Sequence, residues 1–281
     1  MSPRTKTRTR RKKKKTTKNP RFSAKNADKQ VLYQLSVQDV VTEAKFIERI
    51  FKKKRKRPAL SLREDFCGTA LLCGEWVKNG HERAATGVDI DPEVLAWGRE
   101  HNIEPLGSDA SRITLLQQDV RDRVRGRFDI VVAFNFSYWI FKTRDEMRNY
   151  LKTVKRSLGP DGLFMLDAYG GWEAFEPMYE SRPVKGGFTY VWDQDKFDPI
   201  THDVTNYIHF EFKDGTKLEK AFTYEWRYWT LPELTELLGE AGFADVKVYW
   251  DQAEEEDEED YRPTRRAENQ PGWLAYIVAG V

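Results

Sequence analysis

The chain has 281 residues, of which 40% are hydrophobic and 13% aromatic, enough for one large folded domain or two small ones. No run of about 18 apolar residues occurs, which excludes a readable membrane-spanning helix, and no apolar stretch follows the N-terminal charges as a secretory signal requires. The two cysteines, Cys67 and Cys73, fit neither a disulfide framework nor a zinc site. We therefore expect a cytoplasmic protein without a structural metal.

The formal net charge of +2 hides an uneven distribution. Residues 1–18 carry ten Lys or Arg and no acid, whereas residues 254–260 are all acidic. Because the basic block has almost no apolar residues, we expect residues 1–20 to be a disordered tail. Residues 1–18 favour weak contact with nucleic acid through counterion release. The alternative is a solubilising polycation, since no aromatic residues interleave the charges.

Helical and strand patterns alternate from residue 41 to residue 169. Apolar spacing predicts helices over 41–51, 69–78 and 144–158, and a further helix that starts at Pro92 behind the cap Asp91. Thr143 and Glu146 form a capping box. Strands are predicted over 57–64, 84–90, 113–120, 128–134 and 162–169. This alternation predicts parallel crossovers and a doubly wound α/β sheet.

The pattern changes after residue 185. Three strands, 188–197, 203–212 and 216–229, follow one another without helices, and Asp214-Gly215 is a two-residue hairpin signal. A capping box at Thr230 and Glu233 then starts a helix that ends near Gly242, and strands follow at 245–250 and 273–280. We predict one domain over 21–281, with an aromatic-rich antiparallel insertion at 185–229.

Acidic residues end three successive predicted strands. Glu64, Asp89 and Asp119 lie at these ends, where ligands bind in open α/β sheets, and Gly68 lets backbone approach a ligand closely. The Asp89 carboxylate can accept hydrogen bonds from two ribose hydroxyls, and Asp119 can accept one from an adenine amino group. The pattern predicts a nucleoside site; helix N-capping by each acid is the alternative.

The turn after the first strand argues against a dinucleotide. A pyrophosphate site needs G-x-G-x-x-G, and Phe66 occupies one of the glycine positions here. A neutral or cationic ligand near Glu64 fits this turn better.

Several ordered motifs together resemble the class I S-adenosylmethionine-dependent methyltransferases. They are EDFCGTA (64–70), GVDIDPEVL (87–95), QQDVRD (117–122), FDIVVAFNFSYW (128–139), LKTVKRSLGPDGLFMLD (151–167) and LPELTELLGEAGF (231–243). The resemblance implies a mostly parallel seven-stranded sheet whose last strand is antiparallel between the fifth and sixth. It implies S-adenosylmethionine as cofactor and the insertion as a lid over the substrate. Phe66 and Ala70 depart from the family's glycines.

The resemblance also implies the residues that contact the cofactor. Asp89 would bind the ribose, Asp119 and Val120 would lie near adenine, and Tyr33, ahead of the first helix, would close over the cofactor. Arg63 is unusual in a core strand and is expected either to pair with Glu64 or Asp89 or to bind the cofactor carboxylate. The full expected set is Tyr33, Arg63, Glu64, Phe66, Cys67, Gly68, Thr69, Asp89, Ile90, Asp119, Val120 and Asn135.

No catalytic triad is visible, and alignment of an activated methyl group supplies much of the rate in such chemistry. The candidate catalytic residues are Asn135, Tyr138 and Tyr169. The stretch containing the first two distantly resembles the NPPY motif of amino-group methyltransferases. In the alternative, Asn135 caps a loop and Tyr138 packs under the lid. Asp167 is expected to be a base or to bind backbone.

Other residues of the insertion carry open interpretations. His202 and His209 are expected to be structural, and a role as a base is the alternative. Four aromatic residues are expected either to hold a cationic or planar substrate or to form the core of the lid: Tyr224, Trp226, Tyr228 and Trp229.

The sequence thus favours methyl transfer from S-adenosylmethionine to N or O of a small-molecule acceptor by in-line displacement. Two alternatives remain: a nucleic-acid or protein methyltransferase tethered by its basic tail, and a non-catalytic binder of the cofactor.

Overall fold

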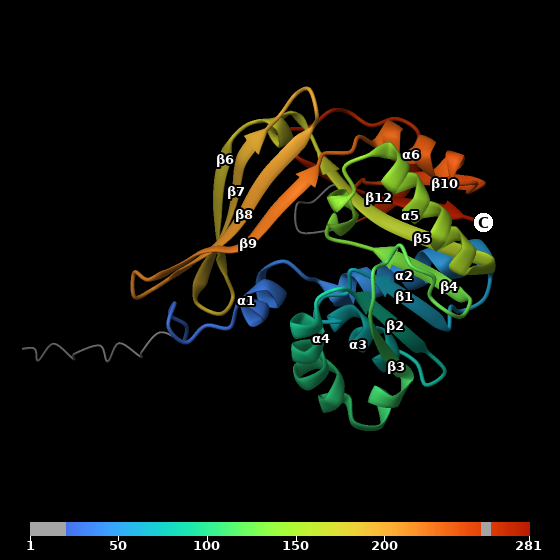
Figure 1. Cartoon of the computed structure of the whole chain (residues 1–281), viewed down its shortest axis with the longest axis horizontal. Helices are drawn as coiled ribbons and strands as arrows, with labels where there is room; N and C mark the ends of the chain where they lie inside the picture. Colours follow the sequence, from blue (N-terminus) through green and yellow to red (C-terminus); the bar gives the residue numbers. More distant parts are fainter. Residues whose placement is uncertain (1–20, 254–259) are drawn as a thin grey trace, which may run out of the picture.

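The computed structural model of the chain describes residues 21–253 and 260–281, so the expected tail and most of the acidic block lie outside the described residues. A large sheet with helices on both faces forms the body of the molecule, and a second sheet stands beside it (Figure 1). None of the described helices is long and apolar enough to cross a membrane.

The large sheet has eight strands in the order β11-β10-β12-β5-β4-β1-β2-β3. The five strands β1 to β5 are parallel to one another. As expected, β12 runs antiparallel between β5 and β10. The expected number of seven is wrong by one edge strand, because the short β11 pairs with β10. The bounds are β1 Ser61–Asp65, β2 Ala84–Asp89, β3 Ile113–Gln117, β4 Phe128–Ala133, β5 Leu158–Gly170, β10 Asp245–Asp251, β11 Tyr261–Thr264 and β12 Trp273–Gly280.

Helices cover both faces of this sheet, each through a buried apolar stripe. The face covered by α2 (Val40–Arg55), α3 (Leu71–Lys78) and α4 (Pro92–Gly98) buries side chains such as Ile47 and Trp76. The opposite face, under α5 (Arg144–Ser157) and α6 (Leu231–Glu240), buries Tyr150 and Leu237. Shorter helical turns are Arg99–Ile103, Glu104–Arg112, Ser137–Ile140 and Trp172–Phe175. The connection from β3 to β4 carries no helix.

The predicted N-terminal caps of α4, α5 and α6 are confirmed, whereas the helix predicted over 69–78 begins at Leu71. The Asp91 carboxylate accepts the backbone N–H of Glu93 at 2.8 Å, and Pro92 opens α4. The capping boxes of α5 and α6, Thr143 with Glu146 and Thr230 with Glu233, are both present. These side chains satisfy amide groups that the first helical turn leaves without partners.

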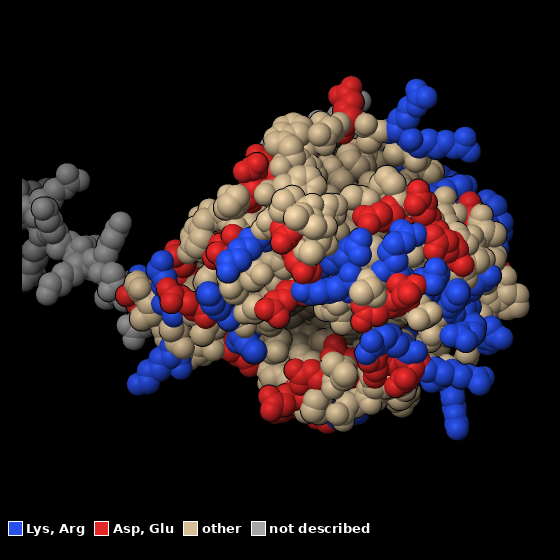
Figure 2. Space-filling model, turned by 45° about the horizontal axis from the view of Figure 1, so that its top comes forward, with Lys and Arg blue, Asp and Glu red and all other residues tan. Residues whose placement is uncertain are grey.

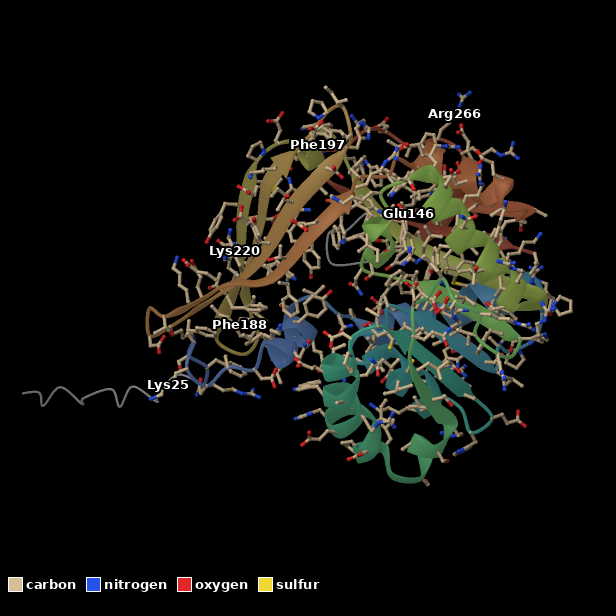
Figure 3. All side chains as sticks on the ribbon, in the orientation of Figure 1. Lys25, Glu146, Phe188, Phe197, Lys220 and Arg266 are labelled. Atoms are coloured by element: carbon tan, nitrogen blue, oxygen red, sulfur yellow. The ribbon has the colours of Figure 1, made fainter. Side chains whose placement is uncertain are left out.

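The second sheet is antiparallel and has four strands rather than three, in the order β6-β7-β8-β9. It begins before the expected residue 185, because β6 pairs with β7 although it is largely exposed and contains Pro183. β7 runs from Phe188, beside α1, to Phe197 at the opposite end (Figure 3). The bounds are β6 Met178–Val184, β7 Phe188–Phe197, β8 Asp203–Phe212 and β9 Lys217–Arg227.

A short helix, α1 (Lys29–Ser36), joins the two parts, and Tyr33 lies within it rather than ahead of the first helix. Its fully buried Leu32 packs in the apolar core of the second sheet. On its other side, the Gln34 amide donates to the Thr69 hydroxyl at 2.8 Å, and Asp28 accepts the Trp97 indole N–H at 2.7 Å. Thus α1 contacts the second sheet, the turn after β1 and α4 (Figure 1).

Candidate cofactor and acceptor site

The turn after β1 takes a shape that leaves one side of Gly68 open. Phe66, Gly68 and Ala70 have φ values of 57°, 52° and 54°, a region that costs energy for residues with a side chain. A Cβ atom on Gly68 would meet nothing within 4 Å. The Asp89 carboxylate fixes the turn by accepting the Gly68 N–H at 2.8 Å. A ligand can therefore approach the backbone here.

Glu64 supports the same turn from beneath. Its Oε2 accepts the backbone N–H of Cys73 at 3.1 Å and the Cys73 thiol at 3.0 Å, and so caps the first turn of α3. Burial raises the pKa of Glu64 to about 7. The carboxyl group thus serves the fold and also faces the cleft described next.

A cleft of about 400 Å³ lies over the turn, between the large sheet, α1 and β9. Figure 2 shows a hollow just below the centre of the molecule in that view, with acidic side chains on its lower rim. The wall of the cleft contains eight of the residues expected to contact the cofactor. These eight are Tyr33, Glu64, Phe66, Cys67, Gly68, Thr69, Asp89 and Asn135.

Arg63 does not line the cleft, and the prediction that it pairs with Glu64 or Asp89 is wrong. Its side chain is fully buried on the α5 face of β1, where Nε donates to Asp65 Oδ1 at 2.6 Å. The guanidinium also donates to the Ser157 hydroxyl and to the Val120 carbonyl, each at 3.2 Å. The pairing follows from strand geometry, because residues two apart on a strand share a face. Arg63 cannot reach a ligand in the cleft.

The three other expected cofactor residues do not line the cleft either. Val120 is buried in the core, and Ile90 is 67% exposed outside the cleft. Asp119 binds Arg121, whose Nη2 donates to Oδ2 at 2.6 Å, and these hydrogen bonds hold the pKa of Asp119 below its usual value. The expected contact of Asp119 with adenine stays a prediction.

A second, smaller cavity of about 230 Å³ adjoins the cleft. The cavities share Tyr33, Asn135, Tyr224 and Trp226. No Asp, Glu, His, Lys or Arg of the described chain lines this aromatic pocket. Its lining consists of Tyr33, Val37, Asn135, Phe136, Tyr169, Tyr190, Trp192, Ile208, Tyr224 and Trp226.

Two of these aromatic residues, Tyr190 and Trp192, were not expected from the sequence. Their spacing of two residues on β7 was the available signal, because it places both side chains on one face of the strand. Among the insertion aromatics, the structure assigns Tyr224 and Trp226 to the pocket and buries Tyr228 and Trp229 outside it.

Asn135 stands between the two cavities, held there by Asp167. Asn135 and Phe136 both have a φ of 57°. The two carboxylate oxygens of Asp167 accept the backbone N–H of Asn135 at 2.7 Å and of Phe136 at 3.0 Å. Burial raises the pKa of Asp167 to about 7. Of the two roles considered for Asp167, the structure shows the backbone contact.

The two candidate catalytic tyrosines differ. Tyr138 is fully buried, donates its hydroxyl to the Asp167 carbonyl at 2.6 Å and lines neither cavity, so its expected catalytic role is wrong. Tyr169 lines the aromatic pocket, stacks on Trp139 at a centroid distance of 4.7 Å and accepts from Asn206 at 3.3 Å. Neither lid histidine lines the cleft or the aromatic pocket; His209 binds Asp193 at 3.1 Å.

Comparisons with known proteins agree with this arrangement. A family model described as a methyltransferase domain matches residues 67–164, from the turn after β1 to β5. The Bacillus subtilis (strain 168) protein named "Putative methyltransferase YqeM" is 26% identical over 186 residues, which are 63% of this chain and 70% of that protein.

Two solved structures share the fold. An S-adenosylmethionine-dependent methyltransferase from Clostridium acetobutylicum ATCC 824 superposes with a TM-score of 0.68 at 16% identity, covering 90% of this chain and 97% of that one. CalS10, an amino pentose methyltransferase from Micromonospora echinaspora solved with S-adenosylmethionine bound, superposes with a TM-score of 0.65 at 16% identity. The match covers 89% of this chain and 95% of that one. The sheet order and the matched family model agree: residues 67–164 are a methyltransferase domain, and the chain has the fold of S-adenosylmethionine-dependent methyltransferases.

Proposed function

We propose that the chain transfers a methyl group from S-adenosylmethionine in the cleft to an amine nitrogen of a small molecule in the aromatic pocket. One observation carries the proposal: the two cavities meet along Tyr33, Asn135, Tyr224 and Trp226. Ligands bound on the two sides of this boundary would be neighbours, as direct transfer requires.

The cleft has the donor set that this cofactor needs. Asp89 is half-buried at the rim, and its carboxylate keeps lone pairs beyond those used by Gly68 and Asp91, so it would hold the ribose hydroxyls. The open side of Gly68 leaves room for the backbone to approach the ligand. When bound, S-adenosylmethionine supplies a methyl group on an electrophilic sulfonium. The chain itself binds, orients and excludes water.

The lining of the aromatic pocket favours nitrogen over oxygen as the acceptor atom. A hydroxyl acceptor must lose its proton to become a good nucleophile, and the pocket offers no carboxylate or histidine for that step. A neutral amine attacks through its lone pair without a base, and aromatic faces stabilise the cationic product. The Asn135 side chain, at the boundary, would orient the amine by accepting its N–H. CalS10, which shares the fold, is described as an amino pentose methyltransferase.

The test is a screen of small amines and matched alcohols for methyl transfer, with cofactor binding measured by calorimetry. We expect amine products, and we expect Trp192→Ala to lower kcat/KM for the amine while the Kd for S-adenosylmethionine stays unchanged, because Trp192 lines only the aromatic pocket. Trp172→Ala is the matched control, since Trp172 is 50% exposed and lines neither cavity. Faster transfer to alcohols, or equal losses in both variants, would count against the assignment.

The ten basic residues in 1–18 favour a second candidate, a nucleic-acid or protein acceptor tethered by this tail. Deletion of residues 1–20 would then raise KM steeply, with a strong salt dependence. An unchanged KM for such an acceptor rejects the tether. Methyl transfer to any acceptor excludes the third candidate, a non-catalytic cofactor binder.

A further inference from the structure

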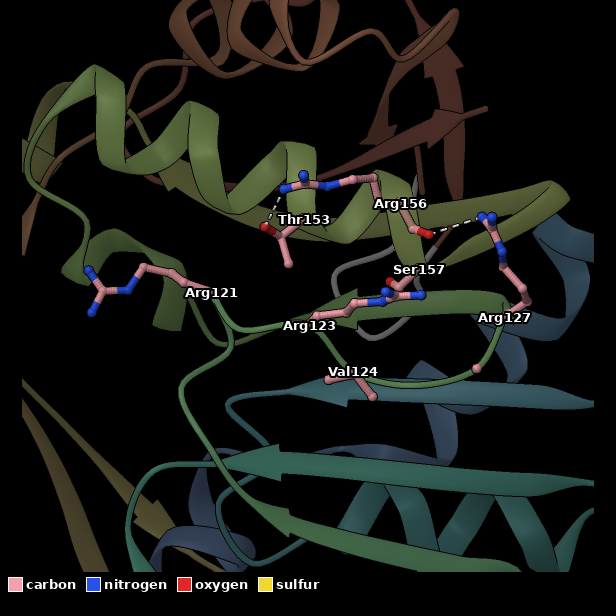
Figure 4. Close-up of a pocket in the computed structure, with 8 residues that line it drawn as sticks. Arg121, Arg123, Val124, Arg127, Thr153, Arg156 and Ser157 are labelled. Atoms are coloured by element: carbon pink, nitrogen blue, oxygen red, sulfur yellow. Dashed lines mark hydrogen bonds between the residues drawn. The ribbon is translucent and has the colours of Figure 1, made fainter.

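A third cavity, of about 410 Å³, lies away from the proposed reaction site and shares no residue with the cleft or the aromatic pocket. It is formed by the helix-free connection from β3 to β4 and the last turns of α5 (Figure 4). Its lining consists of Arg121, Arg123, Val124, Gly126, Arg127, Thr153, Arg156 and Ser157. We call it the arginine cavity.

The charge of the arginine cavity is unbalanced. Four guanidinium groups line it and no carboxylate does. Arg121 is neutralised by Asp119 and points away from the centre of the cavity in Figure 4. Within the described part of the chain, Arg123, Arg127 and Arg156 have no carboxylate within 4.0 Å, as the ion pairs show. Three cations thus share one cavity without a counter-charge.

Part of this arrangement serves the fold. Arg127 Nη1 donates to the carbonyls of Arg156 and Leu158, each at 2.9 Å, and so satisfies the C-terminal end of α5. Arg156 Nη2 donates to the Thr153 hydroxyl at 3.1 Å. These contacts fix both guanidinium groups at the cavity and use only some of their five N–H donors.

Arg123 has no such structural use. Its side chain extends beneath α5 toward Ser157 (Figure 4), and no hydrogen bond or ion pair of Arg123 occurs with the described residues. Thr153 and Ser157 also line the cavity, but the Ser157 hydroxyl donates to the Val154 carbonyl at 2.7 Å and the Thr153 hydroxyl accepts from Arg156, so the guanidinium groups are the free donors. Exposed guanidinium groups around an open cavity of this volume match an oxyanion with several acceptor oxygens.

From this geometry we propose that the arginine cavity binds a small molecule bearing a diphosphate or oligophosphate group. Three unbalanced cations match the charge of such a group, and a ligand larger than a single phosphate suits the volume. A nucleic-acid strand is the less favoured occupant, because no aromatic side chain lines the cavity to stack a base. The proposal is independent of the proposed acceptor.

The test is calorimetry of the full chain with inorganic diphosphate and tripolyphosphate at about 0.15 M salt. We expect saturable binding with a Kd below about 1 mM. Arg123→Gln and Arg156→Gln should each weaken it about tenfold or more. Arg125→Gln is the matched control, an exposed arginine of the same connection outside the cavity lining, and should change nothing.

Several outcomes would overturn the proposal. No heat of binding at about 10 mM of either probe excludes an affinity useful to a cell. Equal weakening by Arg125→Gln shows diffuse attraction rather than a site. Tighter, Arg123-dependent binding of a phosphodiester oligonucleotide assigns the cavity to nucleic acid. Parallel titrations with S-adenosylmethionine, unchanged in these variants, separate failure here from failure of the proposed function.

Discussion

Replacement of Arg63 by Met tests whether this residue serves the fold or the cofactor. Arg63 and Asp65 are both fully buried and joined at 2.6 Å, so Arg63→Met leaves a buried carboxylate whose remaining side-chain partner is the Tyr150 hydroxyl at 2.9 Å. Removal of one member of a buried pair costs about 3–5 kcal/mol. That is a large share of a typical unfolding free energy of about 5–15 kcal/mol.

The assay is urea unfolding followed by tryptophan fluorescence. With an m-value of about 3 kcal/mol per molar, the expected loss lowers the midpoint by about 1–1.7 M. The double variant Arg63→Met with Asp65→Leu removes both charges and should recover much of the loss, because an apolar pair replaces the ionic one. The Kd for S-adenosylmethionine, measured below the transition, should match that of the unchanged protein. A stability loss below about 1 kcal/mol together with a tenfold weaker cofactor would refute this reasoning.

Three further changes test the site and its supports. Asp89→Asn keeps the size of the side chain and removes the charge, so the Kd for S-adenosylmethionine should rise about 10- to 100-fold in calorimetry; an unchanged Kd would remove Asp89 from the ribose site. Burial raises the pKa of Glu64 to about 7, so the native state holds a proton that the unfolded chain releases. As the pH rises from about 5 to about 7, this group should therefore lower the unfolding free energy by up to about 1.4 kcal/mol per pH unit. Urea titrations of Glu64→Gln should show a shallower fall, and an identical slope would contradict it. Thr143→Ala removes one capping box and should lower the unfolding free energy by about 1 kcal/mol without changing cofactor affinity.

The sequence was sufficient for the elements whose signals are local. The spacing of apolar residues and the capping residues predicted β1 to β5, α4 and α5. The parallel pairing of these strands follows from the alternation of strands and helices along the chain. The acidic end of β2 was found because Asp89 lies at a strand end, where chain position alone places it in the cleft.

Elements that depend on distant partners were missed. α1 has eight residues and packs through Leu32 against the second sheet, whose first strand begins only at Met178. β6 is an exposed edge strand with Pro183, and β11 has four residues, so neither carries a strong period of its own. Helix propensity and alternation are weak guides where tertiary contacts decide.

The prediction of the site was most accurate for the backbone turn and least accurate where the direction of a side chain decides whether it reaches the cleft. The turn at Gly68 lines the cleft as expected, whereas Tyr138 and Arg63 turned into the core. Alternation along β1 was the available signal for Arg63, since it assigns Arg63 and Asp65 to one face and Glu64 to the other.

The second sheet follows β5 and the short turn Trp172–Phe175 in the chain and ends just before α6, so it is one continuous insertion with two junctions. It contributes Tyr190, Trp192, Ile208, Tyr224 and Trp226, while the large sheet and its loops supply Asn135, Phe136 and Tyr169. If the aromatic pocket holds the acceptor as proposed, one continuous stretch of the chain supplies most of the side chains that would select it. Grafting a different hairpin array between the same two junctions offers a route to new substrates that leaves Gly68 and Asp89 untouched.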